Sequence, residues 1–187
     1  VVLDALAALA LRGLGVLVTG QANKDRRRLV VPDDALRVVR AVVPAYGVMD
    51  IYTWYQYLLD NDFDVRDPLS LRIYGDGPQD RPEAFAKRHA LNFLDDLCPT
   101  TPLFVVQGAL DRIVPVDQAH ILSAALAERG RNGDRTTVYE HGGHGFLYWD
   151  DPENRTPEEL ADTERAWEDI LTFLHAQLDG DPAPSSQ

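Results

Sequence analysis

The sequence LFVVQGALDRIVP, from Leu103 to Pro115, decides the fold class together with HGGHGF, from His141 to Phe146. The first stretch is typical of a buried strand that runs into a tight turn carrying one acid, Asp111. The second is a glycine-flanked loop that presents His144. The interval between Asp111 and His144 accommodates one helix and one strand. The two stretches therefore predict an acid and a histidine at the ends of consecutive parallel strands. These are two of the three residues of a hydrolase triad in the order nucleophile, acid, histidine.

The pattern along the chain alternates strand and helix, which predicts an α/β fold with a mostly parallel sheet flanked by helices. The strand candidates are β-branched and bounded by glycine or proline; they are Leu14 to Thr19, Ala41 to Pro44, Leu103 to Gln107 and Thr136 to Glu140.

Two helices have clear boundaries in the sequence. Asp117 to Arg129 places Ile121, Leu122, Ala125 and Leu126 on one face, and Gly130 ends it. Pro157 to Leu178 is the longest helix, with Thr156 as N-cap and Glu159 completing a capping box. Its predicted buried stripe consists of Leu160, Trp167, Leu171, Leu174 and Leu178.

The chain is expected to form a single, partial domain over residues 1–180, followed by a disordered tail at 181–187. Between Gly47 and Cys98 the alternation of strand and helix is lost, and aromatic residues crowd a region that also carries three prolines. We interpret residues 47–98 as a partly helical excursion from the sheet. Its aromatic side chains could cover a pocket, or they could be ordinary core residues.

Composition excludes several classes of protein. A formal net charge of −12 argues against a nucleic-acid binder, which needs a basic surface. No uncharged apolar run is long enough to span a membrane, and no signal peptide is recognised, which favours the cytoplasm. The single cysteine, Cys98, rules out an internal disulfide and any multi-cysteine metal site.

Four segments together resemble the C-terminal half of an α/β-hydrolase, and most closely the catalytic domain of the prolyl oligopeptidase family of serine peptidases. The segments are RAVVPAYGVMD, YGDGPQDRPEAFAKRHALNFLDDL, TPLFVVQGALDRIVPVDQAHILSAALAERG and HGGHGF, within Arg40 to Leu178. The resemblance implies that Asp111 is the triad acid and His144 the triad base. It also implies a peptide or acyl-ester substrate and no cofactor.

The chemistry of such a triad explains the choice of residue types. A serine hydroxyl needs a base within hydrogen-bond reach, and histidine can accept and return a proton near neutral pH. The acid fixes the tautomer of the imidazole and stabilises its protonated form. Gly142, Gly143 and Gly145 let the histidine loop bend and approach its neighbours closely.

The nucleophile position departs from the family pattern. The resemblance implies a G-x-S-x-G turn after the strand Leu14 to Thr19, but Ala22 occupies the serine slot and Asn23 the position of an oxyanion backbone donor. Lys24 replaces a glycine, and Pro32 interrupts the helix expected to follow. Ser70, in the excursion, is the first alternative nucleophile, although nothing in its surroundings activates it.

The resemblance also implies strands before Leu14 and a second oxyanion donor among them, and neither is recognised in this sequence. Strand Leu14 to Thr19 would then have an uncovered edge, so missing N-terminal strands or a partner chain are expected to cover it. Three classes of function remain open: a serine hydrolase with an altered nucleophile region, a non-catalytic hydrolase-like binding module, and an enzyme using His141 and His144 as a metal pair. For the third class no metal ligand with recognisable spacing accompanies the two histidines, so no metal site is assigned.

Overall fold

The computed structural model describes residues 16–18, 41–61, 63, 77–97, 99–131, 133–148 and 152–178. The strands are β1 (Val16–Val18), β2 (Val42–Pro44), β3 (Phe104–Gly108) and β4 (Arg135–Tyr139). The α-helices are α2 (Ile51–Asp60), α4 (Pro82–Ala86), α5 (Asp117–Glu128) and α6 (Pro157–Leu178), and two 3₁₀ helices are η2 (Ala90–Asp96) and η3 (Pro152–Asn154). Each strand lies within one residue of a range expected from the sequence.

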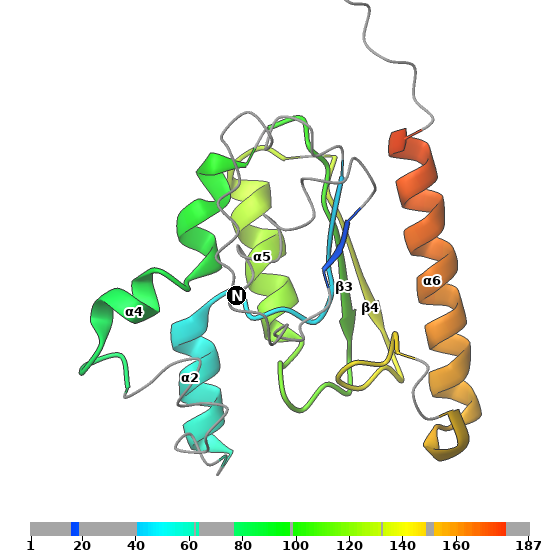
Figure 1. Cartoon of the computed structure of the whole chain (residues 1–187), viewed down its shortest axis with the longest axis horizontal. Coiled ribbons are helices and arrows are strands. Elements are labelled where there is room, and N and C mark those ends of the chain that lie inside the picture. The colour runs from blue at the N-terminus through cyan, green and yellow to red at the C-terminus, as the bar shows by residue number, and fades with distance from the viewer. Residues whose placement is uncertain are drawn as a thin grey trace, which may run out of the picture.

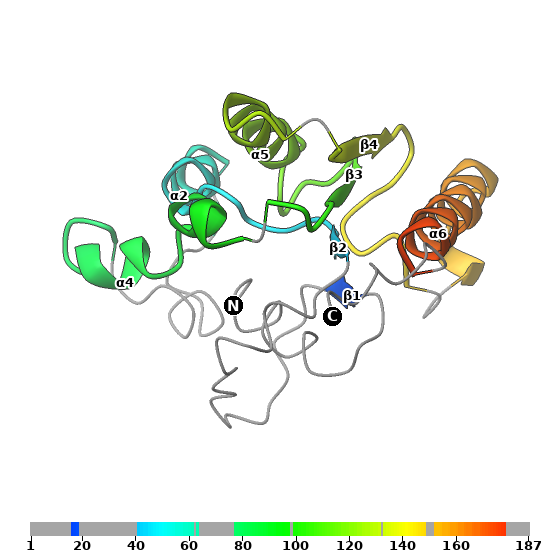
Figure 2. The same cartoon turned by 90° about the horizontal axis from the view of Figure 1, so that it is seen from above.

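The four strands run parallel in the order of the sequence. β1 pairs with β2, with Val16 opposite Val42, and β3 pairs with β4, with Phe104 opposite Arg135. Single bridges from Val42 to Leu103 and from Ala45 to Val106 join β2 to β3. Since parallel strands need crossover connections, helices cover the two faces of the sheet, as Figures 1 and 2 show.

Alternate residues of β2 and β3 divide the core into two layers. On one face, Val43 and Phe104 pack with Ala166, Ile170 and Phe173 of α6. On the other face, the neighbouring positions Val42 and Val105 pack with residues of α5 and η2, namely Ala119, Leu122, Leu126, Ala90 and Leu94. Both faces of the central strands are therefore buried, which explains why their sequences are apolar apart from Gln107.

Helix α6 has the predicted bounds, but of its predicted buried stripe Leu160, Trp167 and Leu174 are half-buried, and the prediction is wrong at Leu171. Thr156 Oγ1 accepts a hydrogen bond from the Glu159 backbone N–H at 3.2 Å, as expected of an N-cap. Leu171, however, is 49% exposed, whereas Ile170 is fully buried. Successive residues lie about 100° apart around a helix, so burial of the line through Ala166 and Ile170 turns Leu171 away from the sheet.

The excursion between Gly47 and Cys98 contains α2, α4 and η2, which confirms that it is partly helical. Trp54 and Phe85 are buried, whereas Tyr52 and Phe63 are 40% and 39% exposed. The excursion lies on the α5 side of the sheet, away from α6 (Figure 2). Its aromatic residues are thus divided between core and surface.

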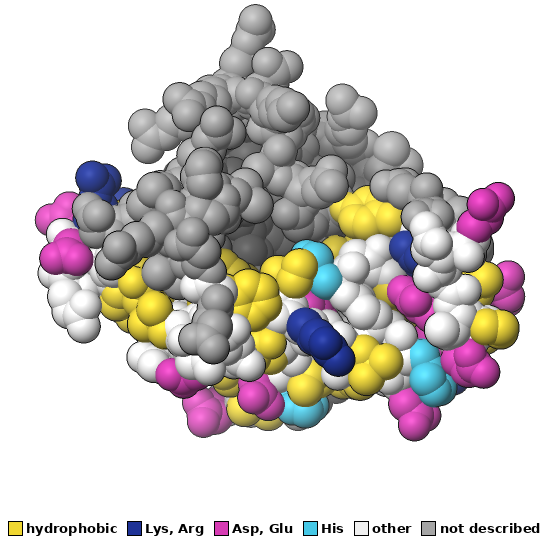
Figure 3. All heavy atoms as spheres, turned by 90° about the horizontal axis from the view of Figure 1, so that it is seen from below, with side chains coloured by type: hydrophobic (Ala, Val, Ile, Leu, Met, Phe, Trp, Pro, Cys, Tyr) yellow, Lys and Arg dark blue, Asp and Glu magenta, His cyan; other side chains and the backbone are white. Residues whose placement is uncertain are grey.

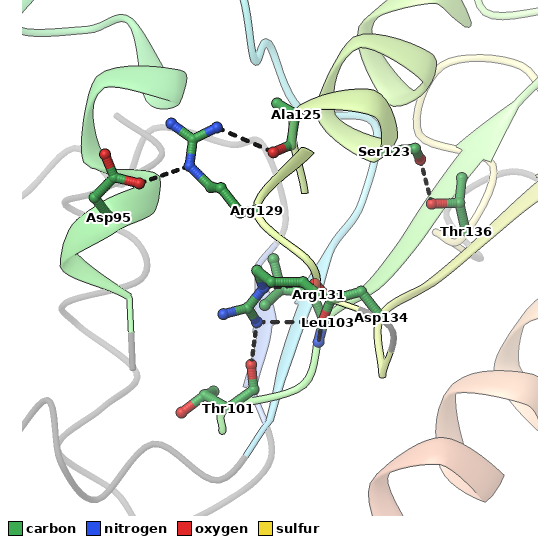
Figure 4. Close-up of polar contacts among 9 residues, drawn as sticks. All are labelled: Asp95, Thr101, Leu103, Ser123, Ala125, Arg129, Arg131, Asp134 and Thr136. Atoms are coloured by element: carbon green, nitrogen blue, oxygen red, sulfur yellow. Dashed lines mark hydrogen bonds and ion pairs between the residues drawn. The ribbon is translucent and has the colours of Figure 1, made fainter. Parts of the chain in front are cut away.

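A polar network holds the amino-terminal ends of β3 and β4 together (Figure 4). Asp134 Oδ1 accepts from the Leu103 backbone N–H at 2.8 Å, and Arg131 donates to the Asp134 carboxylate and to the Thr101 carbonyl. The Arg131 and Asp134 side chains are each 8% exposed. This network fixes where the two strands begin, at the end of the sheet opposite the loops that carry Asp111 and His144.

Candidate active site

Asp111 lies in the turn that follows β3, with its carboxylate completely buried. Oδ1 accepts hydrogen bonds from the backbone N–H groups of Ile113 at 2.9 Å and Val114 at 2.8 Å. This arrangement, in which an aspartate binds N–H groups two and three residues further on, is a standard way to close a turn. Oδ2 accepts a hydrogen bond from Gln107 Nε2 at 3.1 Å and faces His144.

His144 lies in the loop after β4, and its Nδ1 is 2.9 Å from Asp111 Oδ2. An ionised carboxylate can only accept, so the hydrogen bond places the proton on Nδ1 and leaves Nε2 with a free lone pair. The histidine side chain is 34% exposed, which leaves part of the ring accessible. The structure therefore brings the two predicted residues into hydrogen-bond contact.

Backbone contacts join the loop of Asp111 to the loop of His144. Ala109 N–H donates to the Tyr139 carbonyl at 2.8 Å, and Leu110 N–H donates to the Gly142 carbonyl at 3.0 Å. A Cβ atom on Gly108 would lie 2.1 Å from the Gly142 carbonyl oxygen, so only glycine permits this approach. Both loops leave the lower end of the sheet in Figure 1.

Helix α6 fixes the histidine loop from the other side. Asp162 Oδ2 accepts from the His141 backbone N–H at 2.7 Å, and Thr163 Oγ1 donates to the Phe146 carbonyl at 2.7 Å. Trp167 Nε1 donates to the Leu147 carbonyl at 3.0 Å. Three positions of the loop, His141, Phe146 and Leu147, are thus held by side chains of one helix.

Tyr46, directly after β2, packs against His144 with ring centroids 5.4 Å apart in an edge arrangement. It is the one non-glycine residue with positive φ, at 38°, in the described part of the chain. Such a backbone conformation is strained for tyrosine and is found at functional sites more often than elsewhere. Burial raises the pKa of the Tyr46 phenol, which therefore stays neutral.

Helix α2 supports the acid turn, a role that the sequence pattern did not indicate. Trp54 Nε1 donates to the Ile113 carbonyl and Tyr57 Oη to the Arg112 carbonyl, each at 2.7 Å. The aromatic crowding of residues 47–98 was a signal for such contacts, but it did not indicate their partners.

Figure 3 shows hydrophobic side chains on the face of the molecule that contains the lower end of the sheet. In the acid turn at this end, Leu110 and Ile113 are 60% and 45% exposed.

The remaining predicted site residues are not placed. The described residues do not include Ala22, Asn23, the alternative nucleophile Ser70 or Cys98. His141 does not share its partner with His144, because its Nδ1 lies 3.6 Å from Asp162 whereas His144 contacts Asp111.

Within the described ranges, no group of three histidine, cysteine or acidic side chains could hold a metal ion. No helix among them is both long and apolar enough to cross a membrane.

Comparison with known structures defines the class of fold. The chain matches a puromycin-hydrolyzing peptidase of Mycobacterium tuberculosis with a TM-score of 0.55 and 21% identity, over 80% of this chain and 21% of that one. It matches the acylaminoacyl peptidase of Pyrococcus horikoshii with a TM-score of 0.59 and 16% identity, over 79% and 21% of the two chains. A truncated carbohydrate esterase from gut microbiota gives a TM-score of 0.53 at 18% identity, over 75% and 43%. The fold is that of an α/β-hydrolase, as expected.

The chain belongs to the prolyl oligopeptidase family, whose sequence model matches residues 31–169, more than half of the chain. A sequence search of curated proteins finds no match. The chain spans about a fifth of the length of the two peptidases named above.

Proposed function

We propose that this chain carries the acid and the base of a serine hydrolase site of the prolyl oligopeptidase type, acting on peptide or acyl-ester bonds. The observation that carries the proposal is the 2.9 Å contact between His144 Nδ1 and the fully buried carboxylate of Asp111. In this role His144 Nε2 accepts the proton of the nucleophilic hydroxyl and later returns it to the leaving group. Asp111 holds the ring and stabilises its protonated form.

Family membership supports hydrolase chemistry, and the named structural relatives are peptidases and an esterase. The choice between peptide and ester bonds remains open within the proposal, because both proceed through the same attack on a carbonyl carbon. A buried acid next to a half-exposed histidine, at the carboxyl ends of parallel strands, is where α/β proteins place catalytic groups.

In this function Ala22 occupies the nucleophile slot, so that the attacking hydroxyl is missing there, and the Asn23 backbone N–H is one oxyanion donor. The unmodified chain should therefore not react with a fluorophosphonate probe, which requires an activated hydroxyl. Covalent labelling of the unmodified chain would show that the nucleophile lies elsewhere, with Ser70 the first residue to examine.

The test of the acid and base roles uses Ala22→Ser in a fusion that adds the N-terminal strands of a related hydrolase domain. We expect this fusion to hydrolyse a nitrophenyl ester, and Asp111→Asn or His144→Asn to lower its rate by about 10³–10⁴-fold. The matched control is His141→Asn, in the same loop but beside Asp162, which should leave the rate within a few-fold. Undiminished hydrolysis by the His144→Asn fusion would contradict the proposal.

A second candidate function is a non-catalytic, hydrolase-like binding module, which the alanine at position 22 favours. Such a module would keep Asp111 and His144 while binding a peptide or ester without cleaving it. This function would be favoured over the first if the unmodified chain bound a peptide with measurable affinity and the Ala22→Ser fusion did not hydrolyse the ester.

A further inference from the structure

Gln107 is the last side chain of β3 before the glycine that begins the acid turn, and it is 1% exposed. Its Nε2 donates two hydrogen bonds, one to Asp111 Oδ2 at 3.1 Å and one to the Val114 carbonyl at 2.9 Å. A buried amide is retained only where its hydrogen bonds are satisfied, because an unpaired buried polar group costs free energy. Both contacts of Nε2 lie within the turn that carries the acid.

The two oxygens of Asp111 have different partners. Oδ1 is occupied by the backbone N–H groups of Ile113 and Val114. Oδ2 is the oxygen that faces His144, and Gln107 is its second donor. The backbone thus holds one oxygen of the carboxylate, while a single neutral side chain holds the oxygen used by the histidine.

We infer that Gln107 is a positioning residue of the site, whose amide holds Asp111 Oδ2 in the direction from which His144 Nδ1 approaches. This inference rests on the proposed pairing of Asp111 with His144 as acid and base. An amide suits the position because it donates a hydrogen bond to the carboxylate without placing a further charge beside the imidazole. The second bond, to the Val114 carbonyl, fixes the amide itself and closes the turn around the carboxylate.

The experiment observes the Nδ1 proton of His144 by NMR on the chain as it exists, without any activity assay. In the wild-type chain this proton should give a low-field resonance that exchanges slowly with water, assigned by its loss in His144→Asn. Gln107→Met removes the donor and keeps the side-chain length. We expect the resonance to vanish or to exchange about tenfold faster, as loss of one hydrogen bond to a charged group would allow.

The matched control is Gln118→Met, which removes the other fully buried glutamine, also 1% exposed. Gln118 donates to Thr53 and accepts from the backbone of Met49 and Asp50, so it does not touch the pair. A merely structural role for Gln107 predicts that both variants lose stability and that both keep the resonance. A positioning role predicts that only the Gln107 variant loses it.

Two further measurements keep the inference testable if Gln107→Met does not fold. Gln107→Asn retains a polar amide that cannot reach Oδ2, and it should lose the resonance in the same way. In the unmodified chain, a Gln107 side-chain amide proton should be protected from exchange. A wild-type resonance in any folded Gln107 variant, or a freely exchanging Gln107 amide, would overturn the inference. Absence of the resonance in the wild-type chain would instead overturn the proposed pairing of Asp111 with His144.

Discussion

Four hydrogen-bond donors surround the buried carboxylate of Asp111. Two are backbone groups of its own turn, one is the Gln107 amide, and one is the His144 ring. Hydrogen bonds to the charged form offset the free energy that burial costs. At the scale of single residues, the site therefore depends on groups within four positions of Asp111 in the sequence and on one histidine from the next loop.

Gly108 is expected to tolerate no side chain. In Gly108→Ala the new Cβ would overlap the Gly142 carbonyl oxygen, 2.1 Å away, and backbone atoms cannot move aside as a flexible side chain would. We expect a loss of about 2 kcal/mol or more in the free energy of unfolding, measured by urea denaturation. The loop of His144 should move away from Asp111 in the same variant.

The matched control for that substitution is Gly133→Ala. A Cβ on Gly133 would meet nothing within 4 Å, and its φ is not positive. Its free energy of unfolding should lie within about 0.5 kcal/mol of the wild type. An equal loss in both variants would mean that glycine flexibility in general, and not the approach to Gly142, accounts for the effect.

At the scale of elements, helix α2 should stabilise the acid turn through its side-chain donors. Tyr57→Phe removes only the hydroxyl that donates to the Arg112 carbonyl, and we expect a loss of about 0.5–1 kcal/mol in the free energy of unfolding. Tyr52→Phe, on the same helix, is the matched control, because the Tyr52 side chain is 40% exposed and contacts Phe85 and His89 through its ring. The prediction fails if the two substitutions cost the same.

Helix α6 is attached to β4 by a polar cluster that should make stability depend on pH. Asp169 Oδ2 accepts from the Tyr139 hydroxyl at 2.8 Å, and Oδ1 accepts from Arg135 at 2.9 Å. Partial burial alone would raise the pKa of Asp169, but these hydrogen bonds and the charges of Arg135 and Arg165 outweigh it and lower the pKa. Because the folded-state pKa is the lower one, the stabilisation is present above the unfolded-state pKa and is lost as pH falls through the folded-state pKa.

Asp169→Asn should therefore cost up to about 1 kcal/mol at pH 7, a modest value because Arg135 and Asp169, the two members of the ion pair, are partly exposed. The difference from the wild type should shrink when the free energy of unfolding is measured at acid pH, below the ordinary range of an aspartate. Asp95→Asn is the control, since Asp95 pairs with Arg129 but is 80% exposed. A difference between Asp169→Asn and wild type that stays constant with pH would contradict the assignment.

The elements could be predicted from the sequence to different degrees, for physical reasons. The β-branched runs of β2 and β3 are bounded by proline and glycine, so local pattern was sufficient. The predicted buried stripe of α6 was wrong at Leu171. The hydrophobic residues of this helix cover a broad face, but only the residues in line with Ala166 and Ile170 pack against the sheet. Helix α2 was not predicted as a separate element. Its aromatic residues occur in helices and in strands, and they occur both in the core and at the surface.

At the scale of the whole molecule, the order of strands and helices predicted an α/β fold with a mostly parallel sheet, and the resemblance of four segments predicted the α/β-hydrolase type, which the family and the related structures confirm. Asp111 and His144 could be predicted because each stands in a short local turn pattern. The sequence did not indicate the contacts of Tyr46, Trp54 and Tyr57 with this site. These residues lie far from Asp111 in the sequence, and only the folding of the chain brings them to it. The contacts of Gln107 are local in the sequence. The sequence of a strand, however, does not show whether a buried polar side chain donates a hydrogen bond to a nearby residue or is only packed among its neighbours.

We propose that strands preceding β1, or a partner chain, cover the sheet edge and supply a second oxyanion donor, as the resemblance to hydrolases implied. Ala22→Ser alone should then remain nearly inactive toward a nitrophenyl ester, because loss of one oxyanion donor costs about 10²–10³-fold in rate. The fusion with added N-terminal strands should be at least about 100-fold faster, and the same fusion with Ala22 retained should be inert. Equal rates for Ala22→Ser with and without the added strands would show that the chain completes its own oxyanion hole.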